Sequence, residues 1–102
     1  MDRFDVIFSR RFDDHINALE QSSLHWGQRQ TSAYIQEILL RCESLEVFPM
    51  RYAEIDLDGY QLRAFAHKAH RIFYRIDFNS RRVTFIALLH GRPNYLRQLG
   101  RG

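Results

Sequence analysis

The residues of this chain best suited to chemistry are basic and aromatic side chains in its last third. They are Arg71, Arg75, His90 and Arg92. The planar guanidinium group of arginine makes bidentate contacts to phosphate, and a histidine or tyrosine can transfer a proton. If the chain is an enzyme, this set predicts phosphodiester cleavage.

Other reactive motifs are weak or absent in the sequence. His67 and His70 form an H-x-x-H at an expected hairpin turn without a third nearby ligand, so we interpret them as polar turn residues and expect no metal site. There is no glycine-rich phosphate loop, paired acid motif or nucleophile elbow to support an ordinary hydrolase or a nucleotide-binding enzyme. Cys42 is the only cysteine, so no intramolecular disulfide can form. We therefore expect no cofactor.

Charge is divided unevenly along the chain. Residues 61–102 carry nine Lys or Arg and one acid, Asp77, whereas residues 1–60 carry six bases and eleven acids, which gives net charges of +8 and −5. Fourteen of the fifteen bases are arginine, which favours planar contacts to carboxylate or phosphate. A basic folded surface attracts anionic partners, so function should be sought first in the second part of the chain.

Length and composition indicate one compact domain spanning residues 1–102, with 45% apolar and 14% aromatic content. No apolar run approaches the roughly 20 residues that a membrane-spanning helix needs. The N-terminus MDRFDVIFSRRF carries charges where a signal peptide needs an uninterrupted apolar segment. We expect a cytoplasmic protein.

The first half of the chain predicts a strand followed by two helices. Phe4, Val6 and Phe8 alternate with Asp5 and Ser9, as in a half-buried strand, and Ile7 suggests that the other face is partly covered too. Ser9 can then cap an amphipathic helix that Gly27 ends or kinks. A second helix, terminating before Pro49, is indicated by an apolar stripe of Tyr34, Ile35, Ile38, Leu39, Cys42 and Leu45. Because their link is short, the helices should form a hairpin, with Trp26 at its tip turned toward the core.

The second half predicts a β-meander. Residues 48–60 have no clean period and read as a surface loop. Three strands follow, at about residues 62–67, 70–77 and 82–90, joined by turns rich in polar residues. The sequence thus predicts an α+β fold in the order β-α-α-β-β-β, with a short C-terminal helix or tail and with the helices packed on one face of the antiparallel sheet.

Tight turns fix which residues share a face of this sheet. They would place Arg63 opposite Tyr74 and Ile76 opposite Val83. The face packed on the helices is then nearly all apolar and holds Phe65, Ile72, Tyr74, Ile76, Val83, Phe85, Ala87 and Leu89. The reverse face holds Arg71, Phe73, Arg75, Arg82, Thr84, Ile86, Leu88 and His90. Uncovered hydrocarbon among these charges would be costly in water, so a partner is implied.

Arg63 is the exception to this register. The register turns its side chain toward the core face, where an unpaired guanidinium would be prohibitively costly. An edge position would let the aliphatic stem pack while the head reaches solvent or the acidic loop of Glu54, Asp56 and Asp58.

The order of elements and three short motifs resemble the RelE/ParE superfamily of bacterial type II toxin-antitoxin toxins. The motifs are Leu62-Arg63, the H-R-I-F-Y-R run at residues 70–75 and the L-H-G-R run at residues 89–92. The likeness covers nearly the whole chain, and the spacing is similar to that of ParE-like members. It implies the same fold and a small toxin, blocked by a cognate antitoxin, ParD-like or similar, that folds on it.

Two activities occur within that superfamily. RelE-like members cut mRNA on the ribosome with basic residues and often a His or Tyr, whereas ParE-like members are associated with poisoning DNA gyrase. The resemblance matches Arg71 and Arg92 to arginines of the ribonucleases, but it places Leu62 and Ala64 where those enzymes have lysines. Neither side chain can donate to a phosphate or move a proton. We therefore expect a ParE-like gyrase inhibitor that is not an enzyme; the alternatives are a ribosome-dependent mRNA endonuclease and a degenerate member that only binds its antitoxin. For the endonuclease, the resemblance implies that Arg71, Arg75 and Arg92 hold the phosphate and stabilise its transition-state charge, while His90 or Tyr95 handles protons.

We expect the antitoxin and the target to contact the reverse face and the end of the last strand. The predicted partner-binding residues are Arg63, Arg71, Phe73, Arg75, Ile86, Leu88, His90 and Arg92. A segment that folds on binding suits a surface that mixes arginines with apolar side chains.

Overall fold

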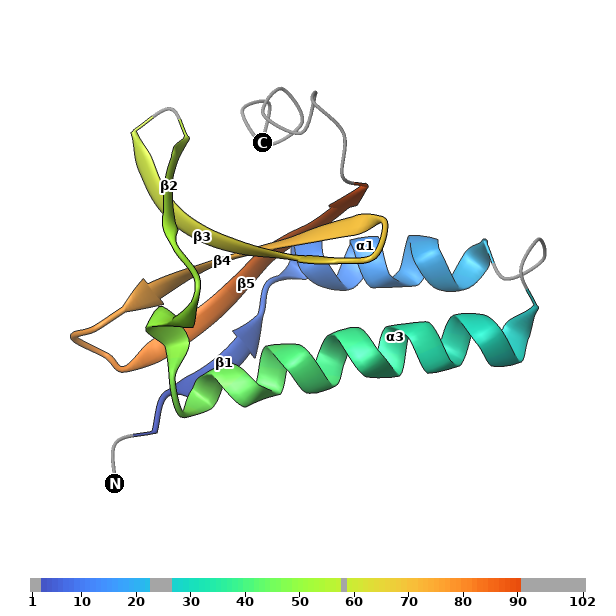
Figure 1. Ribbon diagram of the computed structural model, residues 1–102, viewed down its shortest axis with the longest axis horizontal. Coiled ribbons are helices and arrows are strands. Elements are labelled where there is room, and N and C mark those ends of the chain that lie inside the picture. Colours follow the sequence, from blue (N-terminus) through green and yellow to red (C-terminus); the bar gives the residue numbers. More distant parts are fainter. Residues whose placement is uncertain (1–2, 23–26, 58, 91–102) are drawn as a thin grey trace.

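Two helices cover one face of a five-stranded sheet in the computed structural model, which describes residues 3–22, 27–57 and 59–90 (Figure 1). The strands lie in the order β1-β5-β4-β3-β2. In chain order the elements are β1 (Asp5–Phe8), α1 (Arg10–Gln21), α3 (Gln28–Glu43), η1 (Ser44–Glu46), η2 (Pro49–Arg51), β2 (Glu54–Leu57), β3 (Tyr60–His67), β4 (His70–Asp77) and β5 (Arg82–His90). The predicted α+β order is confirmed; the expectations for Trp26 and for the C-terminal helix or tail lie outside the described residues.

The helices begin at residues suited to that place. Ser9 Oγ accepts a hydrogen bond from the amide of Phe12 at 3.1 Å, so the predicted N-cap of α1 is confirmed. Gly27 has a different role from the predicted one, because α1 ends at Gln21 and Gly27 is the N-cap of α3. Its φ of +91° is a conformation that a residue with a Cβ adopts only under strain. Neither described helix has the length and apolar composition that a membrane span requires.

The meander has the predicted register over most of its length. Arg63 pairs with Tyr74 and Ile76 with Val83, which confirms the turn-based alignment. At the other edge of the sheet, β1 lies parallel to β5, with Val6 beside Val83, so the first strand of the described chain adjoins the last one.

An extra strand lies where the sequence predicts a loop over residues 48–60. β2 pairs antiparallel with β3, and Ile55 stands opposite Leu62. The turn between them contains Gly59 at φ +81°, a value suited to glycine. The loop prediction is wrong at β2 because the acids of this segment alternate with apolar residues, which is an edge-strand pattern as well as a loop composition.

A β-bulge in β5 changes the faces of the sheet near its end. Phe73 pairs with Ala87 but Tyr74 pairs with Phe85, so Ile86 is an extra residue without a partner on β4. Beyond the bulge the alternation is shifted by one residue. The face assignments made from strict alternation are therefore wrong for Ala87 and Leu89, which lie on the reverse face, and for Leu88 and His90, which lie on the face toward the helices.

Residues of α1 and its N-cap make hydrogen bonds to backbone groups of β5 at this bulge and on either side of it. The Ser9 amide donates to the Phe85 carbonyl at 2.9 Å, and Ser9 Oγ donates to the Ile86 carbonyl at 3.2 Å. The Leu88 amide donates to Nδ1 of His15 at 3.0 Å. Buried backbone groups must find partners, so these contacts stabilise the irregular segment and fix α1 against it.

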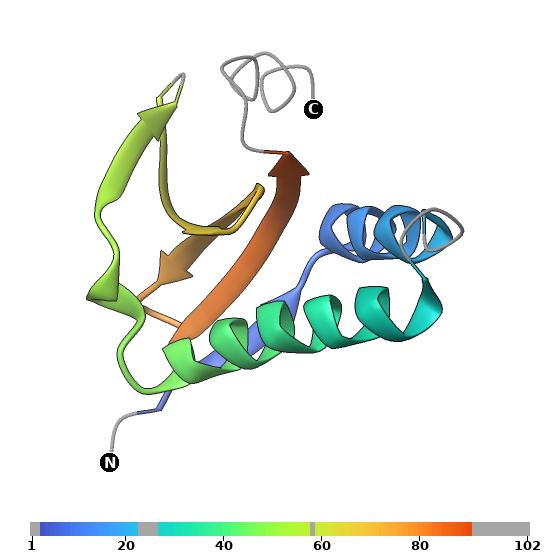
Figure 2. The same cartoon turned by 45° about the vertical axis from the view of Figure 1, so that its right-hand side comes forward.

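Two hydrophobic cores lie on opposite sides of the sheet. The larger one joins the helices to the sheet, with Phe12, Ile38, Tyr74, Val83 and Phe85 all fully buried. Figure 2 shows α1 and α3 side by side on this side of the curved sheet. The smaller one, on the reverse side, is the reverse-face cluster: Leu62, Phe73 and Ala87 are buried, with Ile55, Ala64, Ile86 and Leu89 packed partly buried around them.

Candidate partner interface

Strand β4 places two arginines and one phenylalanine on the reverse face of the sheet. Arg71 is half-buried, Arg75 is exposed, and Phe73 between them is fully buried. Their β5 neighbours are Leu89, opposite Arg71, and Thr84, opposite Arg75. The predicted grouping of Arg71 and Arg75 on one face is confirmed.

The reverse-face cluster makes this face apolar at its centre. The expectation of uncovered hydrocarbon at Phe73 is wrong, because the chain buries Phe73 completely with its own residues. The partly buried rim, which includes Ile86 and Leu89, is still accessible in part. A half-open apolar patch bordered by guanidinium groups fits a segment that carries both acidic and apolar side chains.

Leu62 and Ala64, the positions that the resemblance matches to lysines of the ribonucleases, belong to this cluster. Leu62 is 7% exposed and Ala64 is half-buried. Neither can donate a hydrogen bond, and an apolar environment disfavours a charged phosphate. This part of the face can bind hydrocarbon but cannot stabilise the charge of a phosphoryl transition state.

His90 and Leu88 lie apart from the two arginines. His90 pairs with His70, and their rings meet edge to face with 5.5 Å between centroids. His70 points toward α3, where its Nδ1 is 2.6 Å from the hydroxyl of Tyr34. Leu88 is 5% exposed and belongs to the larger core. The expectation that His90 and Leu88 share the face of the arginines is therefore wrong.

Arg63 is held by backbone carbonyls inside the molecule. Its NH1 donates to the carbonyl of Tyr52 at 2.6 Å and to that of Met50 at 3.4 Å, and its NH2 is 3.6 Å from the Glu54 carboxylate. The predicted contact with the acidic segment is confirmed at Glu54. The predicted edge position is wrong because β2 lies outside β3. With a side chain only 17% exposed, Arg63 fixes the segment that leads into β2.

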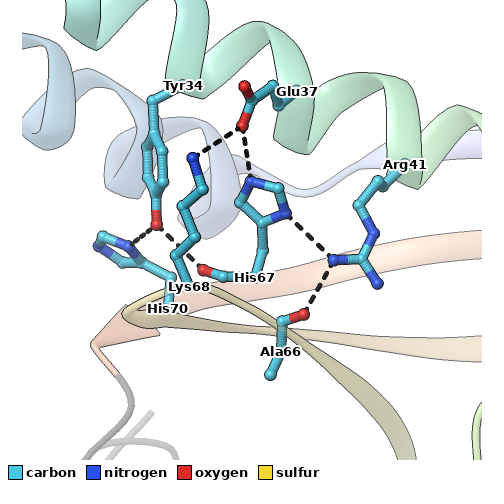
Figure 3. Close-up of polar contacts among 7 residues, drawn as sticks. All are labelled: Tyr34, Glu37, Arg41, Ala66, His67, Lys68 and His70. Atoms are coloured by element: carbon cyan, nitrogen blue, oxygen red, sulfur yellow. Dashed lines mark hydrogen bonds and ion pairs between the residues drawn. The ribbon is translucent and has the colours of Figure 1, made fainter.

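A polar network that the sequence did not reveal fastens the β3–β4 turn to α3 (Figure 3). His67 Nε2 lies 3.0 Å from Glu37, and His67 Nδ1 lies 3.1 Å from the guanidinium of Arg41, which also donates to the Ala66 carbonyl at 2.9 Å. Lys68, whose backbone has φ +54°, also lies 3.5 Å from Glu37. The hydrogen bond from His67, followed by the charge of Lys68, lowers the pKa of the Glu37 carboxyl.

Tyr34 completes this network one turn earlier on α3. Its hydroxyl donates to the carbonyl of His67 at 3.0 Å and meets His70 on the other side (Figure 3). Burial, followed by the nearby His90 and His67, lowers the pKa of His70. The spacing of Tyr34, Glu37 and Arg41, at three and four residues, was a signal for a polar helix stripe facing another element. His67 and His70 are thus structural partners of α3.

The structure locates only three of the five residues that were predicted to act in a ribonuclease. Arg71 and Arg75 share the reverse face, whereas His90 lies on the other side of the sheet. Arg92 and Tyr95 lie outside the described residues. The described members therefore do not converge on one point.

Comparison with known proteins gives a consistent result. Residues 6–95 match the family model described as the ParE toxin of the type II toxin-antitoxin system, parDE. No curated protein sequence matches the chain. Among solved structures, the chromosomal ParDE TA system from P. aeruginosa is similar, with a TM-score of 0.75 and 9% identity over 90% of this chain and 100% of that chain. The toxin-antitoxin complex RelBE2 from Mycobacterium tuberculosis is also similar, with a TM-score of 0.62 and 17% identity over 86% of this chain and 98% of that one.

Proposed function

This chain belongs to the ParE toxin family of type II toxin-antitoxin systems, within the RelE/ParE superfamily, and from that premise we propose that it inhibits growth by poisoning DNA gyrase and is neutralised by a cognate antitoxin. In this proposal the protein acts by binding and catalyses no reaction.

The reverse-face cluster is the observation that carries the proposal. It contains the apolar side chains of Leu62 and Ala64, which lie at the positions where the resemblance expects the lysines of a ribonuclease. A protein that cuts RNA needs charge stabilisation and proton transfer around one phosphate. A protein that binds another protein needs an apolar centre with a polar rim, and this face is of that kind.

The antitoxin is proposed to lie across the same face. Of the predicted partner-binding residues, Arg71, Arg75 and Ile86 occupy accessible or half-buried positions there. An amphipathic segment with acids near the two arginines and apolar side chains on the cluster would bury the remaining hydrocarbon. The antitoxin would thereby block the surface used on the target.

A supercoiling assay tests the gyrase proposal. Purified protein should inhibit gyrase, and Arg71→Ala with Arg75→Ala should weaken that inhibition. Arg10→Ala with Arg29→Ala, which removes two exposed arginines from α1 and α3, is the matched control and should leave the inhibition unchanged. If the wild-type protein arrests growth while gyrase activity is unaffected, the gyrase proposal fails.

A ribosome-dependent mRNA endonuclease is the second candidate, favoured by the shared face of Arg71 and Arg75. Primer extension on mRNA from arrested cells would show cuts within codons. Growth arrest without such cuts removes this candidate. Overexpression without any growth arrest would instead indicate a degenerate member that only binds its antitoxin.

A further inference from the structure

In the described part of the chain, the outer edge of β2 is open for pairing. β2 is the last strand in the sheet order, and along its inner side it pairs with all four facing residues of β3, from Glu54 opposite Arg63 to Leu57 opposite Tyr60. Within residues 3–22, 27–57 and 59–90 no strand lies on its outer side (Figure 1). In an antiparallel strand every second residue directs its N–H and C=O away from the existing partner. Such an edge is a template for another strand.

The two sides of β2 differ in chemistry. Glu54 and Asp56, which are both exposed, occupy alternate positions and so share the side on which Arg63 lies. Ile55 occupies the opposite side beside Leu62, where it packs half-buried against the reverse-face cluster. An added strand would therefore meet carboxylates on one side and the open end of an apolar core on the other.

A second copy of β2 fits this edge poorly. Pairing β2 with itself would bring Glu54 and Asp56 against the same carboxylates of the other chain, and like charges directly opposite one another destabilise a strand pair. The carboxylates that disfavour self-pairing would favour cations at the facing positions. Since the whole chain carries a net charge of +3, attraction of a basic segment would come from this edge and not from the molecule as a whole.

We propose that the outer edge of β2 binds an extended protein segment in which Lys or Arg alternates with apolar residues. The basic side chains pair with Glu54 and Asp56, and the apolar ones extend the reverse-face cluster past Ile55. Backbone hydrogen bonds supply attachment, and alternate side chains supply selectivity. This proposal stands independently of the gyrase proposal, because it concerns the edge of the sheet and makes no assumption about the target.

A blocked peptide of alternating Lys and Val tests the proposal on the full-length protein, with a Glu-Val peptide of the same length as its counterpart. Amide NMR shifts should change along β2, and hydrogen exchange of its outward amides should slow, with the Lys-Val peptide only. Glu54→Gln combined with Asp56→Asn removes two charges but keeps an acceptor for the Gly59 amide, which Asp56 binds at 3.2 Å. Because exposed ion pairs are weak, this variant should lower affinity roughly three- to tenfold.

Asp13→Asn combined with Glu20→Gln is the matched control, since it removes two exposed charges from α1. It should bind the Lys-Val peptide like wild type. Equal binding of the two peptides, shifts centred away from β2, or an equal loss of affinity in both double variants would overturn the proposal. Concentration-dependent protection of β2 without any peptide would also overturn it, because the occupant would then be a second copy of this chain.

Discussion

Nδ1 of His15, on α1, accepts the amide proton of Leu88 at 3.0 Å, across 73 positions of sequence. The contact lies past the end of the β1–β5 pairing, at a residue of β5 that stands opposite Ile72 of β4, two positions beyond the unpaired Ile86. His15 must be neutral at Nδ1 to accept this hydrogen bond. One imidazole thus joins α1 to the part of β5 that follows the bulge.

The substitution His15→Leu removes the nitrogen that accepts the hydrogen bond from Leu88 and keeps a side chain of similar size. We expect the free energy of unfolding to fall by about 1–3 kcal/mol, because the amide of Leu88, a residue only 5% exposed, is left without its partner. Urea denaturation measures the change. His15→Asn, whose side-chain oxygen can take the place of Nδ1, should lose distinctly less. Equal losses in the two variants would show that the hydrogen bond contributes little.

Stability should decrease in mildly acidic solution. Burial, followed by the charge of Arg11 and opposed by that of Asp14, lowers the pKa of His15 below 6.5. Burial, followed by the neighbouring His90 and His67, likewise lowers the pKa of His70. The unfolded chain therefore takes up these protons at a higher pH than the folded chain does. The stabilisation is fully present above pH 6.5 and is lost as the pH falls through the lowered values. Urea midpoints at about pH 7.5 and about pH 5.5 measure the loss, which should be smaller in His15→Asn.

Arg63 should be needed for stability more than the arginines of the reverse face. Arg63→Met keeps the apolar stem but leaves the Tyr52 carbonyl without the donor that lies 2.6 Å away. We expect the free energy of unfolding to fall by about 1–3 kcal/mol. Arg75→Met, at an exposed position on the next strand, is the control and should change it by less than about 0.5 kcal/mol. Similar effects at both positions would contradict a structural role for Arg63.

The hydroxyl of Tyr74 should stabilise the protein by holding η2, which lies between α3 and β2 in the chain, against the sheet. Tyr74 is fully buried, and its hydroxyl donates to the Pro49 carbonyl at 2.6 Å. Burial is the main cause that raises the pKa of this phenol to about 12. Tyr74→Phe should lower the free energy of unfolding by about 1–2 kcal/mol. The control is Tyr60→Phe, because Tyr60 is 70% exposed and should tolerate the change.

Most of the fold could be predicted because its local signals agree with each other. Ser9 has the chemistry of an N-cap, and the turn at Lys68 and Ala69 gives the correct pairing of Arg63 with Tyr74. Alternation then predicts the faces correctly as far as Phe85. Propensity, turn chemistry and periodicity all favour the same structure in these segments.

The bulge, by contrast, has no local signal. Ile86 is one of several apolar residues in succession, and the partners that stabilise its irregular backbone, Ser9 and His15, are more than 70 positions away. A periodicity argument therefore continues past it and assigns Leu88 and His90 to the wrong face. The candidate interface was correspondingly predictable at Arg71 and Arg75, because β4 itself has no extra residue, and unpredictable for the residues of β5 that follow Ile86. The burial of Phe73 also required β2, whose acids favoured a loop in the sequence.

The parallel pairing of β1 with β5 has a consequence for biosynthesis. Val6 emerges from the ribosome early but has no strand to adjoin until Val83 follows it, and Ser9 and His15 likewise wait for the carbonyl and amide that they bind. Contacts between such distant segments form slowly, because a long loop must close first. A nascent chain that stops short of residues 82–90 lacks the strand that lies between β1 and β4, so neither the larger core nor the reverse-face cluster is complete. Any harm that the protein does to its host must begin after translation of that strand.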